Sequence, residues 1–193
     1  MGKKINIAVL GSTRGSDMQA VIDALKAGAL PNIDLKIVIA NKKDAYILER
    51  AKSQGYPALF LDPKGKTREE YDAEILKVLL ENNIEEILLI GYMKIITPVL
   101  VRAYKDKIAN IHPSLLPKYA GGMDLNVHEE VLKNHETETG CTLHYIDEGV
   151  DSGKIIKQKK VLIAKNETPD SLKAKVQQAE QEVIVEYLHD LSD

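Results

Sequence analysis

The stretch Asn110-Ile111-His112-Pro113-Ser114-Leu115-Leu116-Pro117 decides the fold, because the pattern of the chain changes there. The apolar residues just before it predict the end of a buried strand, and Pro113 ends strand pairing because it has no N–H to donate. Asn110 and His112 point to the same side if they keep extended geometry, since strand side chains alternate. Such a pair fits either a capped strand end with a satisfied histidine or part of a ligand site.

Before this stretch, short apolar runs alternate with segments of helical spacing. The apolar runs predict strands over 5–10, 35–40, 58–61, 86–90 and the region up to 110. Helices are expected to begin at 17, 45 and 67 and to end by 28, 54 and 83. Thr67 and Glu70 have the spacing of a capping box. Alternation of strands and helices with short connections predicts a parallel sheet with right-handed crossovers.

After this stretch two strands follow one another without a helix between them. We expect helices over 126–134 and 171–189, the second capped at Thr168-Pro169, and strands over 142–147 and 155–163. The fold predicted is a single α/β domain over 1–193, with a mostly parallel, Rossmann-like sheet flanked by helices and a mixed C-terminal edge.

Composition narrows the function classes. A net charge of -3 and a pI near 6.0 give no reason to expect nucleic acid as a partner. The single Cys141 excludes an intrachain disulfide and a multi-cysteine zinc site. The apolar run after the N-terminus is too short for a signal sequence or a membrane span, so we expect no membrane partner and a cytoplasmic protein.

The turn after the first strand is a candidate phosphate site. Gly11 to Gly15 matches neither the dinucleotide nor the Walker A pattern, and Asn41, not an acidic residue, follows the second strand. A Gly/Ser turn that leads into a helix still presents free N–H groups to a phosphate. Equally, Ser16 or Asp17 could simply cap the helix.

A second candidate is the loop from Asp147 to Gly153. Asp is common in turns for backbone reasons alone. In a loop between two sheet strands, however, Asp151 could face the end of the strand that carries Asn110 and His112, orient the imidazole and favour its charged form. The histidines are not at metal-ligand spacing, so no metal is expected.

Three segments together resemble the phosphoribosylglycinamide formyltransferase family of purine biosynthesis. They are Asn-Ile-His-Pro-Ser-Leu-Leu-Pro-Lys-Tyr at 110–119, the loop 147–153, and Gly-Tyr-Met-Lys-Ile-Ile-Thr-Pro at 91–98. The resemblance covers nearly the whole chain. Its Asn, His-Pro and Asp set is shared by all folate-dependent formyl-transferring and formyl-hydrolysing relatives. Because the chain ends after the last expected helix, we expect no C-terminal domain like that of methionyl-tRNA formyltransferase. We also expect no N-terminal regulatory domain like that of the formyltetrahydrofolate deformylase.

The resemblance implies direct formyl transfer from 10-formyltetrahydrofolate to the amine of glycinamide ribonucleotide, without a metal. It implies that Asn110, protonated His112 and Asp151 are catalytic, with His144 behind them. The residues implied for the ribonucleotide are Gly15, Ser16, Asp17, Pro113, Gln177 and Glu180. Those implied for the folate are Arg68, Met93, Lys94, Ile95, Ile96 and Asn110. Residues 1–109 would form the phosphate-binding half and 110–193 the catalytic and folate-binding half.

The chain departs from the family pattern at several positions. The first loop usually reads Gly-Asn-Gly-Ser-Asn, so Asp17 here would place a carboxylate beside a phosphate, and Arg14 is the new cation nearby. Lys94 replaces the usual Arg, Ala120 replaces a Pro, and the loop 121–127 is longer than usual. Alternatives are a formyltetrahydrofolate hydrolase, a formyltransferase for another sugar amine, or a catalytically silent folate or nucleotide binder. The expected assembly is a monomer or a homodimer.

Overall fold

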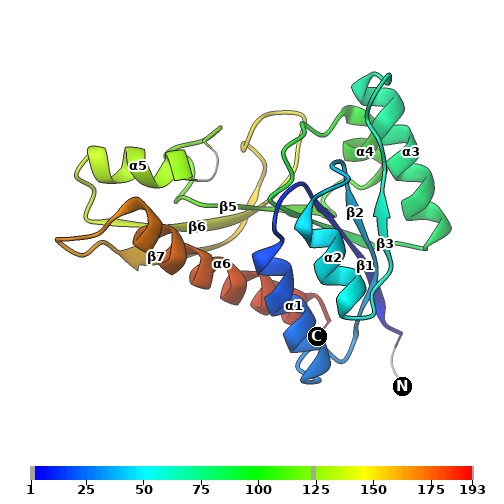
Figure 1. Cartoon of the computed structure of the whole chain (residues 1–193), viewed down its shortest axis with the longest axis horizontal. Coiled ribbons are helices and arrows are strands. Elements are labelled where there is room, and N and C mark those ends of the chain that lie inside the picture. Colours follow the sequence, from blue (N-terminus) through cyan, green and yellow to red (C-terminus); the bar gives the residue numbers. More distant parts are fainter. Residues whose placement is uncertain (1–2, 123–124, 193) are drawn as a thin grey trace.

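A seven-stranded sheet forms the centre of the molecule, with helices on both faces (Figure 1). The computed structural model describes residues 3–122 and 125–192. The strands are β1 (Ile5–Gly11), β2 (Ile33–Ala40), β3 (Ala58–Phe60), β4 (Glu86–Ile90), β5 (Ile108–His112), β6 (Glu138–Tyr145) and β7 (Ile155–Leu162). The helices are α1 (Ser16–Lys26), α2 (Tyr46–Ser53), α3 (Arg68–Glu81), α4 (Pro98–Ala103), α5 (Leu125–Lys133) and α6 (Pro169–Ser192).

The strand order β3-β2-β1-β4-β5-β6-β7 confirms the predicted sheet with a mixed edge. The first five strands pair in parallel, whereas β6 pairs antiparallel with both β5 and β7. β5 is therefore the last parallel strand, and β6, on its other side, runs in the opposite direction. In that pairing Asn110 lies opposite His144, and His112 lies opposite Thr142.

Alternating side chains of the central strands divide the core into two layers. In β1, Ile7 and Val9 pack with α1, α2, α5 and α6 on one face, whereas Ala8 and Leu10 pack with α3 and α4 on the other. Such strands, apolar on both faces, are typical of a covered parallel sheet. None of the helices in the described part of the chain is both long and apolar enough to cross a membrane.

The capping box predicted at the start of α3 is confirmed. Thr67 Oγ1 accepts from the Glu70 N–H at 3.2 Å, and the Glu70 carboxylate accepts from the Thr67 N–H at 2.8 Å.

Most of the other predicted elements are present, with three differences. Helix α4 was not predicted from the sequence. β6 begins at Glu138, four residues before the predicted start at Thr142, and the prediction that β6 reaches Asp147 is also wrong.

Glu86 of β4 is a buried carboxyl whose protonation affects stability. Tyr187 of α6 donates to Glu86 Oε1 at 2.5 Å, and burial raises the pKa of Glu86 to about 7, with the Tyr187 bond and the charge of Lys107 opposing it. The folded state therefore holds this proton more tightly than the unfolded state. Stability from this group is lost as pH rises from about 4.5 to about 7.

Glu86→Gln is expected to remove this loss, because glutamine cannot ionise and its carbonyl still accepts from Tyr187. The gain in unfolding free energy should be on the order of 3 kcal/mol at pH 8 and nearly absent at pH 4.5. Urea unfolding at both pH values measures it. An equal change at the two pH values would show that the substitution acts through packing instead.

Candidate active site

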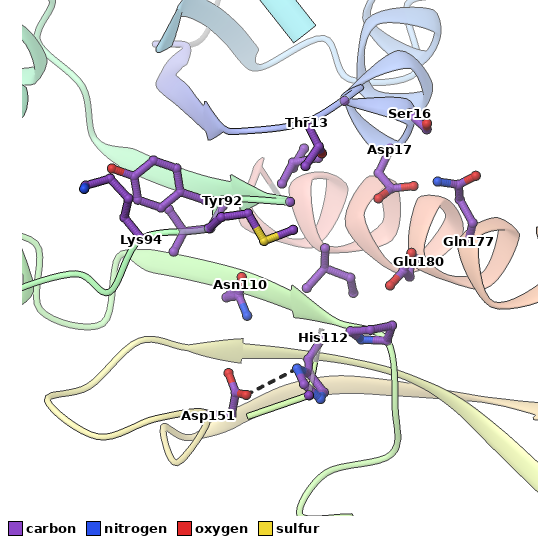
Figure 2. Close-up of a pocket in the computed structure, with 18 of the residues that line it drawn as sticks. Thr13, Ser16, Asp17, Tyr92, Lys94, Asn110, His112, Asp151, Gln177 and Glu180 are labelled. Carbon is purple, nitrogen blue, oxygen red and sulfur yellow. Dashed lines mark ion pairs between the residues drawn. The ribbon is translucent and has the colours of Figure 1, made fainter. Parts of the chain in front are cut away.

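A cavity of about 700 Å³ opens at the carboxyl ends of β1, β4 and β5. Ligands bind at this position in open α/β sheets. The predicted residues that line it are Gly15, Ser16, Asp17, Met93, Lys94, Ile95, Ile96, Asn110, His112, Pro113, Asp151, Gln177 and Glu180. Neither Arg68 nor His144 is among the described lining residues. Figure 2 shows Tyr92 and Lys94 at one side of the cavity and Asp17, Gln177 and Glu180 at the other, with Asn110 and His112 between them.

His112, at the end of β5, is held between a loop carbonyl and a carboxylate. Its Nε2 lies 3.0 Å from the carbonyl oxygen of Tyr119, and its Nδ1 lies 3.3 Å from Asp151 Oδ2 (Figure 2). A carbonyl only accepts, so Nε2 carries the proton in the neutral ring. Nδ1 then gains a hydrogen bond to Asp151 only when the ring takes up a second proton.

The loop after β5 is anchored to the neighbouring strand. The Thr142 hydroxyl on β6 donates to the Ser114 carbonyl at 2.7 Å and accepts from the Leu116 N–H at 3.0 Å. The Ser114 hydroxyl in turn donates to the Lys118 carbonyl at 2.6 Å. These bonds bring the Tyr119 carbonyl back to His112. The prediction that strand pairing ends at Pro113 is confirmed, since β5 ends at His112, and side-chain bonds from β6 hold the loop that follows.

Asp151 reaches the histidine from the loop between β6 and β7. Its Oδ2 also accepts from the Gly121 N–H at 2.8 Å, and the backbone of Asp151 is left-handed, with φ of 50°. Nearby, Gly153 lies so close to the Tyr145 carbonyl that a Cβ would overlap it. The tight loop around Gly153 therefore allows Asp151 to face the end of β5.

The pKa values of His112 and Asp151 are both lowered, for different physical reasons. The pKa of Asp151 is lowered, most of all by hydrogen bonding with His144, so the carboxylate is charged at neutral pH. Burial nevertheless lowers the pKa of His112, because it outweighs the opposing effects of Asp151 and the Tyr119 carbonyl. Asp151 thus favours the charged form of His112, as expected from the sequence, but in the free site burial has the larger effect and the pKa of the ring lies below its ordinary value.

Asn110 is oriented by His144, which is fully buried behind it. The Nδ1 of His144 lies 3.0 Å from the Tyr145 carbonyl oxygen and so carries a proton. Its Nε2 lies 3.1 Å from Asn110 Nδ2 and 3.5 Å from Asp151 Oδ1. With a proton on Nδ1 alone, Nε2 accepts one hydrogen of the Asn110 amide, which leaves the other hydrogen for a ligand in the cavity, whereas a proton on Nε2 would be donated to Asp151.

The other end of the cavity is formed by α1 and α6. Gly15, with φ of 64°, is the N-cap of α1 and no side chain caps this helix, so the alternative in which Ser16 or Asp17 is the cap is wrong. A Cβ on Gly15 would overlap the side chain of Ile47. Asp17 and Glu180 are each only 8% exposed, and both line the cavity.

The Met93–Ile96 segment is joined to the first turn by a residue that sequence reasoning missed. The buried Ser12 hydroxyl donates to Asn41 Oδ1 at 2.6 Å and accepts from the Met93 N–H at 2.8 Å. The Lys94 ammonium lies 5.3 Å from the centre of the Tyr71 ring, one turn along α3 from Arg68. Arg68 is thus exposed near this end, outside the described lining.

Arg50 and Lys173 also line the cavity and were not predicted. Arg50 donates from Nη1 to the Gln19 side chain at 2.8 Å and from Nε to the Arg14 carbonyl at 3.2 Å. Arg50 lies on α2 and Lys173 lies on α6. No pattern in the sequence marks them. Among residues 3–122 and 125–192, no group of His, Cys, Asp or Glu is arranged to hold a metal ion.

Comparison with known proteins identifies the family. The formyl transferase family model matches residues 5–188. Phosphoribosylglycinamide formyltransferase of Haemophilus influenzae is 40% identical over 92% of this chain and 82% of that protein. The chain is 41% identical over 92% of its length to the trifunctional purine biosynthetic protein adenosine-3 of Drosophila melanogaster, but spans only 13% of that protein.

The structure agrees with these sequence matches. The crystal structure of glycinamide ribonucleotide transformylase 1 from Symbiobacterium toebii superposes with a TM-score of 0.93 at 32% identity, over 100% of this chain and 89% of that chain. The sequence and the overall fold thus both match the same group of enzymes. The chain belongs to the formyl transferase family and, within it, to the phosphoribosylglycinamide formyltransferases.

Proposed function

We propose that the chain transfers the formyl group of 10-formyltetrahydrofolate to the primary amine of glycinamide ribonucleotide, a step of de novo purine biosynthesis. The observation that carries the proposal is the arrangement of Asn110, His112 and Asp151 at the middle of the cavity. These groups provide an amide donor, a proton carrier and a charge that stabilises the protonated ring. The names of the similar proteins support the same reaction.

The cavity offers a suitable surface for the folate. Met93 and Ile95, on the loop after β4, are 37% and 60% exposed, and Val150, on the loop after β6, is 60% exposed and also lines the cavity. Exposed apolar side chains lining a cavity suit a flat heteroaromatic ring. The folate supplies the formyl group bound to a nitrogen. We assign its ring to this end and its glutamate tail to the vicinity of Arg68.

The roles of the protein groups follow from their contacts. The free hydrogen of the Asn110 amide is directed at an oxygen placed in the cavity. His112 is neutral at rest, and negative charge developing beside it raises its affinity for a proton. The Asp151 carboxylate at 3.3 Å then stabilises the protonated ring and holds its plane. No enzyme side chain bonds covalently to the formyl group in this proposal, since the amine attacks directly.

The ribonucleotide is assigned to the opposite end. Gly15, Ser16 and Asp17 would receive the phosphate at the start of α1, and Gln177 and Glu180 of α6 would hold the ribose and the glycinamide. Pro113, which follows His112 in the chain, also lines the cavity. The cytoplasmic location, the absence of a metal, and the monomer or homodimer expected from the sequence stay predictions.

The test is a spectroscopic assay of folate release, run with and without glycinamide ribonucleotide. Release that depends on the ribonucleotide supports transfer. Release of formate without any amine would support a hydrolase, and tight folate binding with no release would support a silent binder. Turnover with a different amino sugar but not with the ribonucleotide would assign another acceptor.

Arg14→Ala is expected to weaken acceptor binding, because Arg14 is an exposed cation at the phosphate end of the cavity. The expected rise in KM for the ribonucleotide is about fivefold, or roughly 1 kcal/mol, with kcat nearly unchanged. Lys43→Ala, which removes an exposed cation outside the described lining, is the matched control. An unchanged KM in Arg14→Ala would contradict the assignment of Arg14.

A further inference from the structure

Asp17 presents an unsatisfied oxygen to the phosphate end of the cavity. Its side chain is 8% exposed, and Oδ1 is buried with no hydrogen-bond partner among the described residues. Figure 2 shows the carboxyl group extending from α1 on the side of the cavity where Gln177 and Glu180 of α6 lie. Buried polar atoms are normally paired. An unpaired one that lines a cavity marks a place where a ligand atom completes the bond.

The backbone around Asp17 favours an anion at the same place. α1 begins after Gly15 without a side-chain cap, so the N–H groups of its first turn have no side-chain acceptor. These groups and the positive end of the helix dipole attract a phosphate. A phosphate bound there would lie against the Asp17 carboxyl. Two anions in contact repel unless a proton lies between them.

The surroundings of Asp17 raise the pKa of its carboxyl group, so the group can hold such a proton. Burial raises the pKa of Asp17 to about 6, and a hydrogen bond from Gln181 and the charge of Lys173, both on α6, oppose the rise. The other charged groups that line this end of the cavity are Asp170 and Glu180 of α6, Arg14, and Arg50, which donates to Gln19 of α1. The buried Cys141 thiol on β6 also interacts with Asp17. A phosphate monoester loses its second proton near pH 6 as well. Carboxyl and phosphate therefore have similar proton affinities.

We propose that Asp17 binds the phosphate of the acceptor with one proton shared between the carboxyl oxygen and a phosphate oxygen. This inference rests on the proposed function, since it places the phosphate of the ribonucleotide at α1. Charge-assisted O–H···O⁻ bonds are short and strong. With one proton between them, the carboxyl and the phosphate therefore form a hydrogen bond where two anions would repel each other. When both groups are ionised in the free state, solvent supplies the proton. Binding then takes up one proton, and affinity falls as pH rises.

Calorimetry of ribose 5-phosphate with the whole chain tests the shared proton. Titrations at pH 7.5 in two buffers of different ionisation heat give the number of protons taken up. We expect about one for the natural chain, with affinity falling about tenfold per pH unit between pH 7 and 8. Asp17→Asn should take up almost none and keep its affinity over that range. The matched control is Asp23→Asn, which removes one negative charge from an exposed position of the same helix. This variant should behave like the natural chain.

Three results would overturn the inference. They are no proton uptake by the natural chain, equal proton uptake by Asp17→Asn, and no binding of ribose 5-phosphate between pH 7 and 8. The formyl-transfer assay stands apart from this measurement. A chain that transfers formyl groups but binds ribose 5-phosphate without proton uptake would contradict the shared proton alone. Linked uptake in a chain that releases no folate would contradict the proposed function alone.

Discussion

Replacing His112 by alanine is expected to lower kcat for formyl transfer by about 10²- to 10⁴-fold. The ring lies between Tyr119 and Asp151 at the middle of the cavity, and no other described side chain occupies that position. KM for the ribonucleotide should change little, because its proposed contacts lie on α1 and α6. Measuring folate release against acceptor concentration separates the two constants.

His189→Ala is the matched control for this substitution, because His189 is exposed near the end of α6. It should retain the activity of the natural chain. A His112→Ala variant that keeps more than a tenth of its turnover would show that the ring is a structural side chain. The acceptor would then have to be activated elsewhere in the cavity.

Asp151→Asn is expected to reduce kcat by about 10²-fold or more, while the fold is retained. The amide oxygen can still accept from the Gly121 N–H, so the loop keeps its bond, but the negative charge beside His112 is lost. Since that charge raises the pKa of His112, its removal lowers this pKa further. The limb of the pH–rate profile that reports His112 should therefore move to lower pH.

Glu148→Gln removes a carboxylate from the same loop, where Glu148 pairs with Arg102 at 3.1 Å on the surface. It should leave both kcat and the pH profile unchanged. If Asp151→Asn loses activity without any displacement of the pH limb, Asp151 acts by shaping the loop. Its charge would then have no part in the reaction.

Periodicity predicted most of the fold because the core strands are apolar on both faces and the helices have clear boundaries. The errors arise where neighbours in space decide the structure. β6 extends back to Glu138 because its first residues pair with the end of β7, and Gly140 permits an approach of the Lys159 carbonyl that a Cβ would block. α4 is a short helix whose N-cap Thr97 donates its N–H to the buried Asp72 of α3 at 2.7 Å.

Site residues could be predicted from the sequence where the residue type itself indicates chemistry. They could not be predicted where only the position of a common group in the fold matters. Asn110, His112 and Asp151 are chemically conspicuous, and the resemblance to a family placed them together. Ser12 and the Tyr119 carbonyl carry no such signal, because any sequence offers many hydroxyls and carbonyls. The charge state of His112 could not be predicted either, since it depends on how much water the folded chain removes from the ring. Part of the longer loop 121–127 lies outside the described residues.

The antiparallel pairing of β5 with β6 has a consequence for how the proposed catalytic groups become organised. Asn110 lies opposite His144 and His112 opposite Thr142, so the same backbone ladder that completes the sheet aligns each group with its support. A slip of one residue would turn both side chains to the other face. In the proposed reaction, the geometry of Asn110 and His112 is thus preorganised by strand register during folding, and little reorganisation is needed when the substrates arrive.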